Sequence, residues 1–374
     1  MSASSLSGPD YVRNTQAGAT QDSPALRWVA ADESGWDGEQ LYNRADRYLS
    51  IGSVAVDDGT AGEIVGQLRR DARMSQPPEL KFTHFRDGNR LEVLAGLLSP
   101  GGGLAARAHV YLVDKHYFVT GKIIDLLLEE EAGTRGINLH EGDRARQIAW
   151  TLFNEGPRAL GTDGFNRIIA TMVGFASGRN HDGSVVSVDA LFEELRLAFG
   201  RAHRRQVSQI LQDLLQTREH AEFLLGVLGN TDEPALALEP LIAALPLIGT
   251  LWSDEIGALN MLVDEQKVLT DEMLDHIGTF AAMDVQFSGP RMGTHRRPPD
   301  RAVHSVVRGV SRDHPSIQLA DLIAGAGQVT ARRHAGSPSP AGERLYPLVV
   351  PLISPESLVP HDEPERFAVS TEPG

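Results

Sequence analysis

The stretch ALRWVAAD at residues 25–32 has the two-residue alternation of a β-strand. One face carries Leu26, Trp28, Ala30 and Asp32, and the other carries Arg27, Val29 and Ala31. A turn follows at Ser34 and Gly35. The same profile returns at residues 258–264, ALNMLVD, which also end on a lone carboxylate. Two apolar strands that each end on an Asp are typical of α/β proteins, in which ligands bind at the ends of parallel strands.

Hydrophobic periodicity around these two strands predicts the rest of the fold. Further strands are expected at residues 47–56, 104–113 and 302–310, and helices at 61–73, 117–131, 270–283 and 315–333. The prediction is an α/β protein with a mixed five-stranded sheet flanked by helices and a large all-helical insertion. Its expected parts are a flexible tail at 1–24, a first α/β part at 25–131, the insertion at 132–253, a second α/β part at 254–350 and a C-terminal tail at 351–374.

The composition of the 374 residues is that of a globular protein, with 41% hydrophobic and 23% charged residues. Cysteine is absent, which excludes disulfides, thiolate metal sites and a cysteine nucleophile. No apolar run is long enough to cross a membrane and the N-terminus lacks a secretory pattern, so we expect a cytoplasmic protein without a membrane partner. The net charge of −15 means that a nucleic acid would need a local basic patch or a bound cation.

The segment PSIQLADLIAGAGQV at residues 315–329 contains a single charged side chain, Asp321. A helix that is apolar nearly all round is usually buried. A buried carboxylate needs compensation, either from a cation or from backbone and arginine donors, and the sequence leaves both open.

Four carboxylates stand out along the chain, and each has a bland alternative. Asp32 and Asp264 can be ordinary turn residues, and Glu79, next to Pro77 and Pro78, can be a solvated surface residue. Taken together with Asp321, they lie at the positions where this order of elements can cradle a pair of divalent cations. The predicted catalytic and metal-binding residues are therefore Asp32, Glu79, Asp264 and Asp321, with two Mg²⁺ or Mn²⁺ ions as cofactors.

The motifs DESG (32–35), ELK (79–81), VDE (263–265) and IQLADLIAG (317–325) resemble those of the bacterial domain of unknown function family 3800. The resemblance covers about residues 26–125 and 255–335. It implies a ribonuclease H-like fold with an acidic centre at Asp32, Glu79, Asp264 and Asp321, and a setting near mobile or defence-related genes. One departure is the position of Glu79 between the second and third strands, because in ribonuclease H the Glu lies on the helix after the third.

The function expected from this set is divalent-metal-dependent phosphodiester hydrolysis by a nuclease acting on DNA or RNA. Lys81, Lys115, Arg296 and Arg297 are candidate contacts to substrate phosphates, although each can also be a solvated surface cation. Two alternatives stay open. One is a non-catalytic interaction module in which the helical insertion binds a protein partner, and the other is a phosphohydrolase of small phosphate esters.

Overall fold

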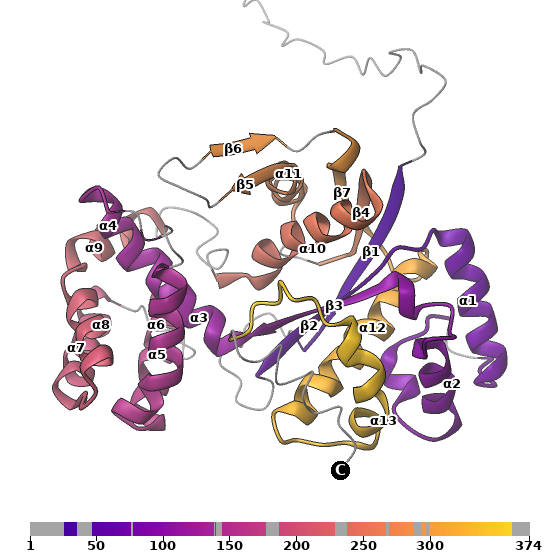
Figure 1. The fold of residues 1–374 in the computed structure, drawn as a ribbon, viewed down its shortest axis with the longest axis horizontal. Coiled ribbons are helices and arrows are strands. Elements are labelled where there is room, and N and C mark those ends of the chain that lie inside the picture. The colour runs from indigo at the N-terminus through magenta and orange to yellow at the C-terminus, as the bar shows by residue number, and fades with distance from the viewer. Residues whose placement is uncertain are drawn as a thin grey trace, which may run out of the picture.

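The computed structural model describes residues 26–35, 47–75, 78–137, 139, 144–176, 187–228, 238–266, 269–286, 293–296 and 299–360. Its centre is a five-stranded mixed sheet with the strand order β3-β2-β1-β4-β7 (Figure 1). The strands are β1 (Arg27–Ser34), β2 (Tyr48–Val54), β3 (Ala108–Asp114), β4 (Leu259–Asp264) and β7 (Val303–Gly309). Strands β1, β4 and β7 run parallel, whereas β2 is antiparallel to β1 and β3. The carboxyl ends of the three parallel strands therefore meet at one edge of the sheet.

One face of this sheet is covered by helices from both ends of the chain (Figure 1). They are α1 (Asp58–Asp71), α2 (Gly88–Leu98), α12 (Pro315–His334) and α13 (Pro340–Val349). Helix α12 lies directly on the sheet because small residues let the backbones approach. A Cβ on Gly52 of β2 would lie 2.3 Å from the Ala324 nitrogen, and one on Gly327 would lie 2.2 Å from the Ser50 hydroxyl. The glycines of the IAGAG segment thus seat this helix.

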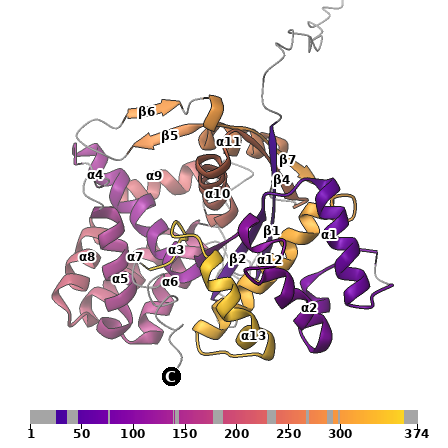
Figure 2. The same cartoon turned by 45° about the vertical axis from the view of Figure 1, so that its right-hand side comes forward.

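The other face carries α10 (Pro240–Ile256) and α11 (Asp271–Ala281). Beside them a lobe of helices follows β3 in the chain, as Figures 1 and 2 show. These helices are α3 (Lys115–Ile123), η3 (Ile124–Glu129), α4 (Glu130–Thr134), α5 (Arg144–Leu160), α6 (Thr162–Ala176), α7 (Val188–Arg201), α8 (Arg205–Leu215) and α9 (Arg218–Leu228). The side chains of β1 alternate between the two cores, with Ala30 facing α12 and Val29 and Ala31 facing α10 and the lobe.

The predicted fold class, a mixed five-stranded α/β sheet flanked by helices, is confirmed. The expected end of the helical block at residue 253 cuts through α10, which instead packs on the sheet. The Trp252 ring lies 4.5 Å from the His109 ring of β3, and its indole nitrogen donates to the Ser53 hydroxyl at 2.9 Å. The sequence does not mark where the helical insertion ends, because α10 is an apolar helix that follows other helices without a change in pattern.

Several local expectations need correction. Residues 105–107 form a 3-10 turn, η2 (Ala105–Arg107), before β3 begins. Helices α2 and α13 were not predicted, nor was the antiparallel pair β5 (Met283–Gln286) and β6 (Gly293–Arg296). Other short turns are η1 (Phe82–Phe85), η6 (Pro299–Arg301) and η7 (Val350–Leu352).

The C-terminal tail expected at 351–374 is in fact packed as far as residue 360. Ile353 and Leu358 form parallel bridges with Val110 and Val113, and the Ser354 nitrogen donates to the Val110 carbonyl at 2.8 Å. This segment covers the outer edge of β3, where free backbone groups would otherwise need water. The expected tail at 1–24 and residues 361–374 lie outside the described residues. None of the described helices is long and apolar enough to span a membrane.

Candidate functional site

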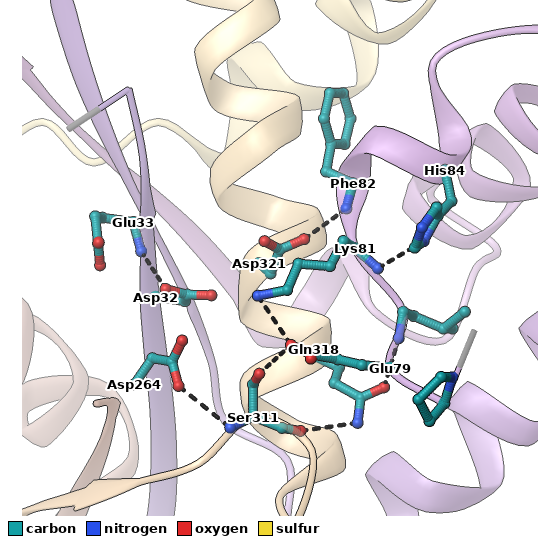
Figure 3. Close-up of polar contacts among 12 residues, drawn as sticks. Asp32, Glu33, Glu79, Lys81, Phe82, His84, Asp264, Ser311, Gln318 and Asp321 are labelled. Carbon is teal, nitrogen blue, oxygen red and sulfur yellow. Dashed lines mark hydrogen bonds and ion pairs between the residues drawn. The ribbon is translucent and has the colours of Figure 1, made fainter. Parts of the chain in front are cut away.

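Three of the predicted carboxylates converge beside α12. Asp32 lies near the carboxyl end of β1, Asp264 ends the neighbouring strand β4, and Asp321 lies in the second turn of α12 (Figure 3). Strands β1 and β4 pair in parallel with Ala31 opposite Val263, which brings their ends together. Asp32 shares its face with Ala30, and Asp264 shares its face with Leu262, so both face α12.

Burial and neighbouring carboxylates raise the pKa of all three side chains. Asp32 is only 7% exposed, and burial together with the charges of Glu33, Asp321 and Asp264 raises its pKa well above the ordinary value. Burial also raises the pKa of Asp321, to which Glu79 and Asp264 contribute. Burial raises the pKa of Asp264 in the same way. The site therefore concentrates negative charge at low exposure.

Each of the three carboxylates accepts a hydrogen bond from a backbone nitrogen. Asp32 accepts from the Glu33 nitrogen at 2.8 Å, and Asp321 accepts from the Phe82 nitrogen at 2.5 Å. Asp264 accepts from the Ser311 nitrogen at 3.2 Å. Within the described part of the chain, none of the three forms an ion pair with an arginine. Of the alternative partners expected for Asp321, a backbone donor is present in the Phe82 nitrogen, whereas no arginine pairs with it among the described residues.

Lys81 is the cation at the centre of this group. Its ammonium lies 2.8 Å from Glu79, and Figure 3 shows it reaching into the space between β1 and α12. Partial burial opposes its charge, but Glu79, Asp321 and Asp32 outweigh burial and raise the pKa of Lys81. Glu79 also accepts from the Ser311 hydroxyl, and these two donors outweigh its partial burial and lower its pKa. Glu79 is thus the best compensated carboxylate of the four.

The segment that carries Glu79 and Lys81 is anchored to α12 by Gln318, which sequence reasoning overlooked. The Gln318 side chain accepts from the Leu80 nitrogen at 3.0 Å and donates to the Ser311 carbonyl at 2.8 Å. It is 3% exposed. A glutamine in the apolar motif IQLAD was the available signal, because a buried amide requires partners on both of its polar atoms.

Glu33 is a second residue that was quoted in the DESG motif but given no role. Figure 3 shows its side chain pointing away from Lys81, to the other side of β1. There it lines a small cavity with Asp264, Gln266 and Leu245. Burial and the charge of Asp264 raise the pKa of Glu33 to about 7. The strand alternation that exposes one face to α12 could have placed Glu33 on the opposite face.

The raised pKa values predict a stability that falls with pH when no divalent cation is present. The pKa of Glu33 rises from 4.5 to about 7 on folding, so its contribution is complete below pH 4.5 and is lost as pH rises through about 7. Melting in EDTA between pH 5 and pH 8 should therefore show a decline that Glu33→Gln flattens by up to about 3 kcal/mol. Glu63→Gln, at an exposed position of α1, is the control. An unchanged slope in Glu33→Gln would contradict the assignment.

The predicted phosphate contacts fare differently. Lys81 lies at the site, but Lys115 is fully buried and donates to the Gly35 carbonyl at 2.7 Å. A substrate phosphate cannot reach it there, so the prediction for Lys115 is wrong. Lys115 instead holds the turn that follows Asp32, where Gly35 has φ +88°. Arg296 ends β6 but its side chain lies outside the described residues, as does Arg297 altogether.

The carboxylate oxygens of this site suit a hard divalent cation, the cofactor expected from the sequence. Carboxylate oxygens are the ligands that Mg²⁺ and Mn²⁺ prefer, and buried carboxylates without arginine partners gain most from a cation. As placed, no three Asp, Glu or His side chains among the described residues form a ready-made metal cluster. Asp32, Asp264 and Asp321 have the oxygen donors and the location that such a cation requires. In this structure the positive charge beside them is the Lys81 ammonium.

Comparison with protein-family models, with curated proteins and with solved structures found no match for this chain.

Proposed function

We propose that the protein is a divalent-metal-dependent nuclease. The observation that carries this proposal is the convergence of Asp32, Asp264 and Asp321, from β1, β4 and α12, into one poorly compensated negative site. Structural carboxylates are normally paired, so a site that raises the pKa of each member is a candidate for function. Its position at the carboxyl ends of parallel strands is where α/β sheets place ligands.

Asp32, Asp264 and Asp321 would hold the cations, with Glu79 as a further oxygen donor. When bound, Mg²⁺ or Mn²⁺ ions supply activation of water and stabilisation of the leaving oxygen of a phosphodiester. The chain's own residues position the Lys81 ammonium beside these carboxylates. Gln318 and the Phe82 nitrogen fix the Glu79–Lys81 segment against α12, which directs the Lys81 ammonium to where a substrate phosphate would meet the site.

The ribonuclease H-like relationship belongs to the same proposal. It is supported by the sheet, in which β2 and β3 lie on one side of β1 and the parallel strands β4 and β7 lie on the other, and by the helix α12 that follows β7 and carries Asp321. The helices α1 and α2 between β2 and β3 depart from the predicted run of three consecutive strands. The residues quoted from the family 3800 motifs also meet in space, with Asp32, Asp264 and Asp321 facing one another. A role in defence or in mobile elements, a cytoplasmic location, and a helical insertion that binds a protein partner stay predictions from the sequence.

The proposal is tested by incubating the full chain with labelled single- and double-stranded DNA and RNA. Cleavage is expected with Mg²⁺ or Mn²⁺ and none with EDTA, because water activation requires the cation. Asp189→Asn, at a position of α7 whose side chain is 82% exposed, should cleave like the wild type. Cleavage that persists in EDTA, or no cleavage of any of the four substrates, would contradict the nuclease proposal. Turnover of a small phosphate ester alone would favour the phosphohydrolase alternative.

A further inference from the structure

A polar cleft lies between the end of α1 and the beginning of α2. It has a volume of about 470 Å³ and is lined by Ala72, Arg73, Asp87, Gly88, Asn89 and Arg90. Figures 1 and 2 both show α1 and α2 side by side at the margin of the molecule. The Asn89 amide bridges the two helices by donating to the Asp71 carbonyl at 3.3 Å. The walls of the cleft are therefore two helices that this hydrogen bond joins.

The arginines around this cleft lack acidic partners. Arg73 and Arg90 are exposed, and within the described residues their side chains form no ion pair or hydrogen bond. Elsewhere in the described chain many arginines pair with carboxylates, as Arg167 does with Glu194 and Arg344 with Glu92. Unpaired guanidinium groups gathered in one place are conspicuous in a protein of net charge −15.

The first turn of α2 adds further donors. Its N-cap residue, Asp87, makes no side-chain hydrogen bond to the helix. The backbone N–H groups at the start of a helix have no partners inside the helix, and they favour negative charge. Asp87 is also the one carboxylate in the cleft lining, so an anion bound there would be repelled by it. Replacing Asp87 should therefore change anion binding in the opposite direction from replacing the arginines.

The cleft and the acidic site are connected along the chain by η1, which follows Lys81 and precedes Asp87. The Lys81 nitrogen donates to the His84 ring at 3.1 Å, and burial and then the charges of Arg90 and Arg69 lower the pKa of His84. The charge of Arg90, which lines the cleft, thus acts on His84 in η1. At a rise of about 2 Å per residue the four residues of η1 span roughly 8 Å. A chain of phosphates is long enough to touch both places.

We propose that the arginines of this cleft bind a backbone phosphate of a polynucleotide, adjacent to the phosphodiester that meets the acidic site. Guanidinium groups bind phosphate oxygens through paired hydrogen bonds, and an acidic protein needs such a local patch to hold a polyanion. The cleft thereby supplies contacts that the sequence suggested for Arg296 and Arg297. The proposal rests on the proposed nuclease function for the identity of the substrate, but binding to the cleft requires no cleavage.

The experiment measures binding of labelled DNA and RNA oligonucleotides, single- and double-stranded, to the full chain in EDTA over a range of salt. We expect Arg73→Gln/Arg90→Gln to weaken binding about fivefold to tenfold and to lower the salt slope by about 1, because a phosphate contact is lost. Asp87→Asn should strengthen binding. Arg196→Gln, at an exposed arginine of α7 that is paired with Glu193, is the matched control and should behave like the wild type.

Binding and salt slope that are unchanged in Arg73→Gln/Arg90→Gln would overturn the proposal, as would a wild-type chain that binds none of the oligonucleotides. Weaker binding in Asp87→Asn would also overturn it. The two proposals fail separately. Binding that depends on the arginines without any metal-dependent cleavage would contradict the nuclease function alone, whereas cleavage that is indifferent to the arginines would contradict the cleft alone.

Discussion

Replacing Asp32 with Asn is expected to abolish metal-dependent cleavage while making the metal-free protein more stable. Asp32 is the most deeply buried of the three converging carboxylates and is repelled by Glu33, Asp321 and Asp264. An amide removes the charge at nearly constant shape, so the free energy of unfolding in EDTA should rise by roughly 1–2 kcal/mol. The same change removes a cation ligand, and cleavage should fall at least about 100-fold.

The two effects are measured together as melting temperatures with and without Mn²⁺. A cation at 100 times its Kd stabilises the wild type by about 2.7 kcal/mol, and Asp32→Asn should lose this gain. Asp189→Asn should keep both the wild-type melting temperature in EDTA and its response to Mn²⁺. A variant that is less stable in EDTA, or that responds to Mn²⁺ as the wild type does, would show that Asp32 is a structural residue.

Gly52→Ala is expected to be a strongly destabilising single-methyl change. An added Cβ would lie 2.3 Å from the Ala324 nitrogen and 2.4 Å from the Ala320 carbonyl oxygen, both in the backbone of α12. Backbone cannot rotate away as a side chain can, so the helix must lift from the sheet. We expect a loss of about 3 kcal/mol or more, measured by urea unfolding.

The matched control for this change is Gly96→Ala. Gly96 lies inside α2, and a Cβ there would meet no atom within 4 Å. Alanine favours helix over glycine, so this variant should gain about 0.5–1 kcal/mol. A urea midpoint for Gly52→Ala that equals the wild-type value would mean that α12 does not cross β2 at Ala324 and would remove the support of Asp321.

The sheet could be predicted because its strands have short, distinct apolar patterns bounded by turns. The predicted strand at 47–56 and β2 differ by a few residues, and Pro315 begins α12 as expected. Helices α2 and α13 were overlooked because each is short and lies among glycines and prolines that favour turns. The antiparallel strands β5 and β6 were overlooked because each has only four residues, so that the alternation in MDVQ is too short to stand out and GTHR has none.

The candidate site was predictable in part for a similar reason. Asp32, Asp264 and Asp321 are lone charges in apolar runs, a signal that survives without any knowledge of contacts. Lys115 was misplaced because a lysine just after a strand resembles a surface residue, and only the packing shows its ammonium on the Gly35 carbonyl. The unpaired state of Arg73 and Arg90 likewise depends on how α1 meets α2, which no local pattern encodes.

The placement of Asp321 on α12, far along the chain from β1, has a consequence for synthesis. A nascent polypeptide that has emerged only as far as β4 carries Asp32, Glu79 and Asp264 but lacks Asp321. Domains form from the N-terminal side as translation proceeds, so the proposed chemistry would switch on only after α12 has docked. A prematurely terminated message would then yield a fragment that is inert toward the cell's own nucleic acids.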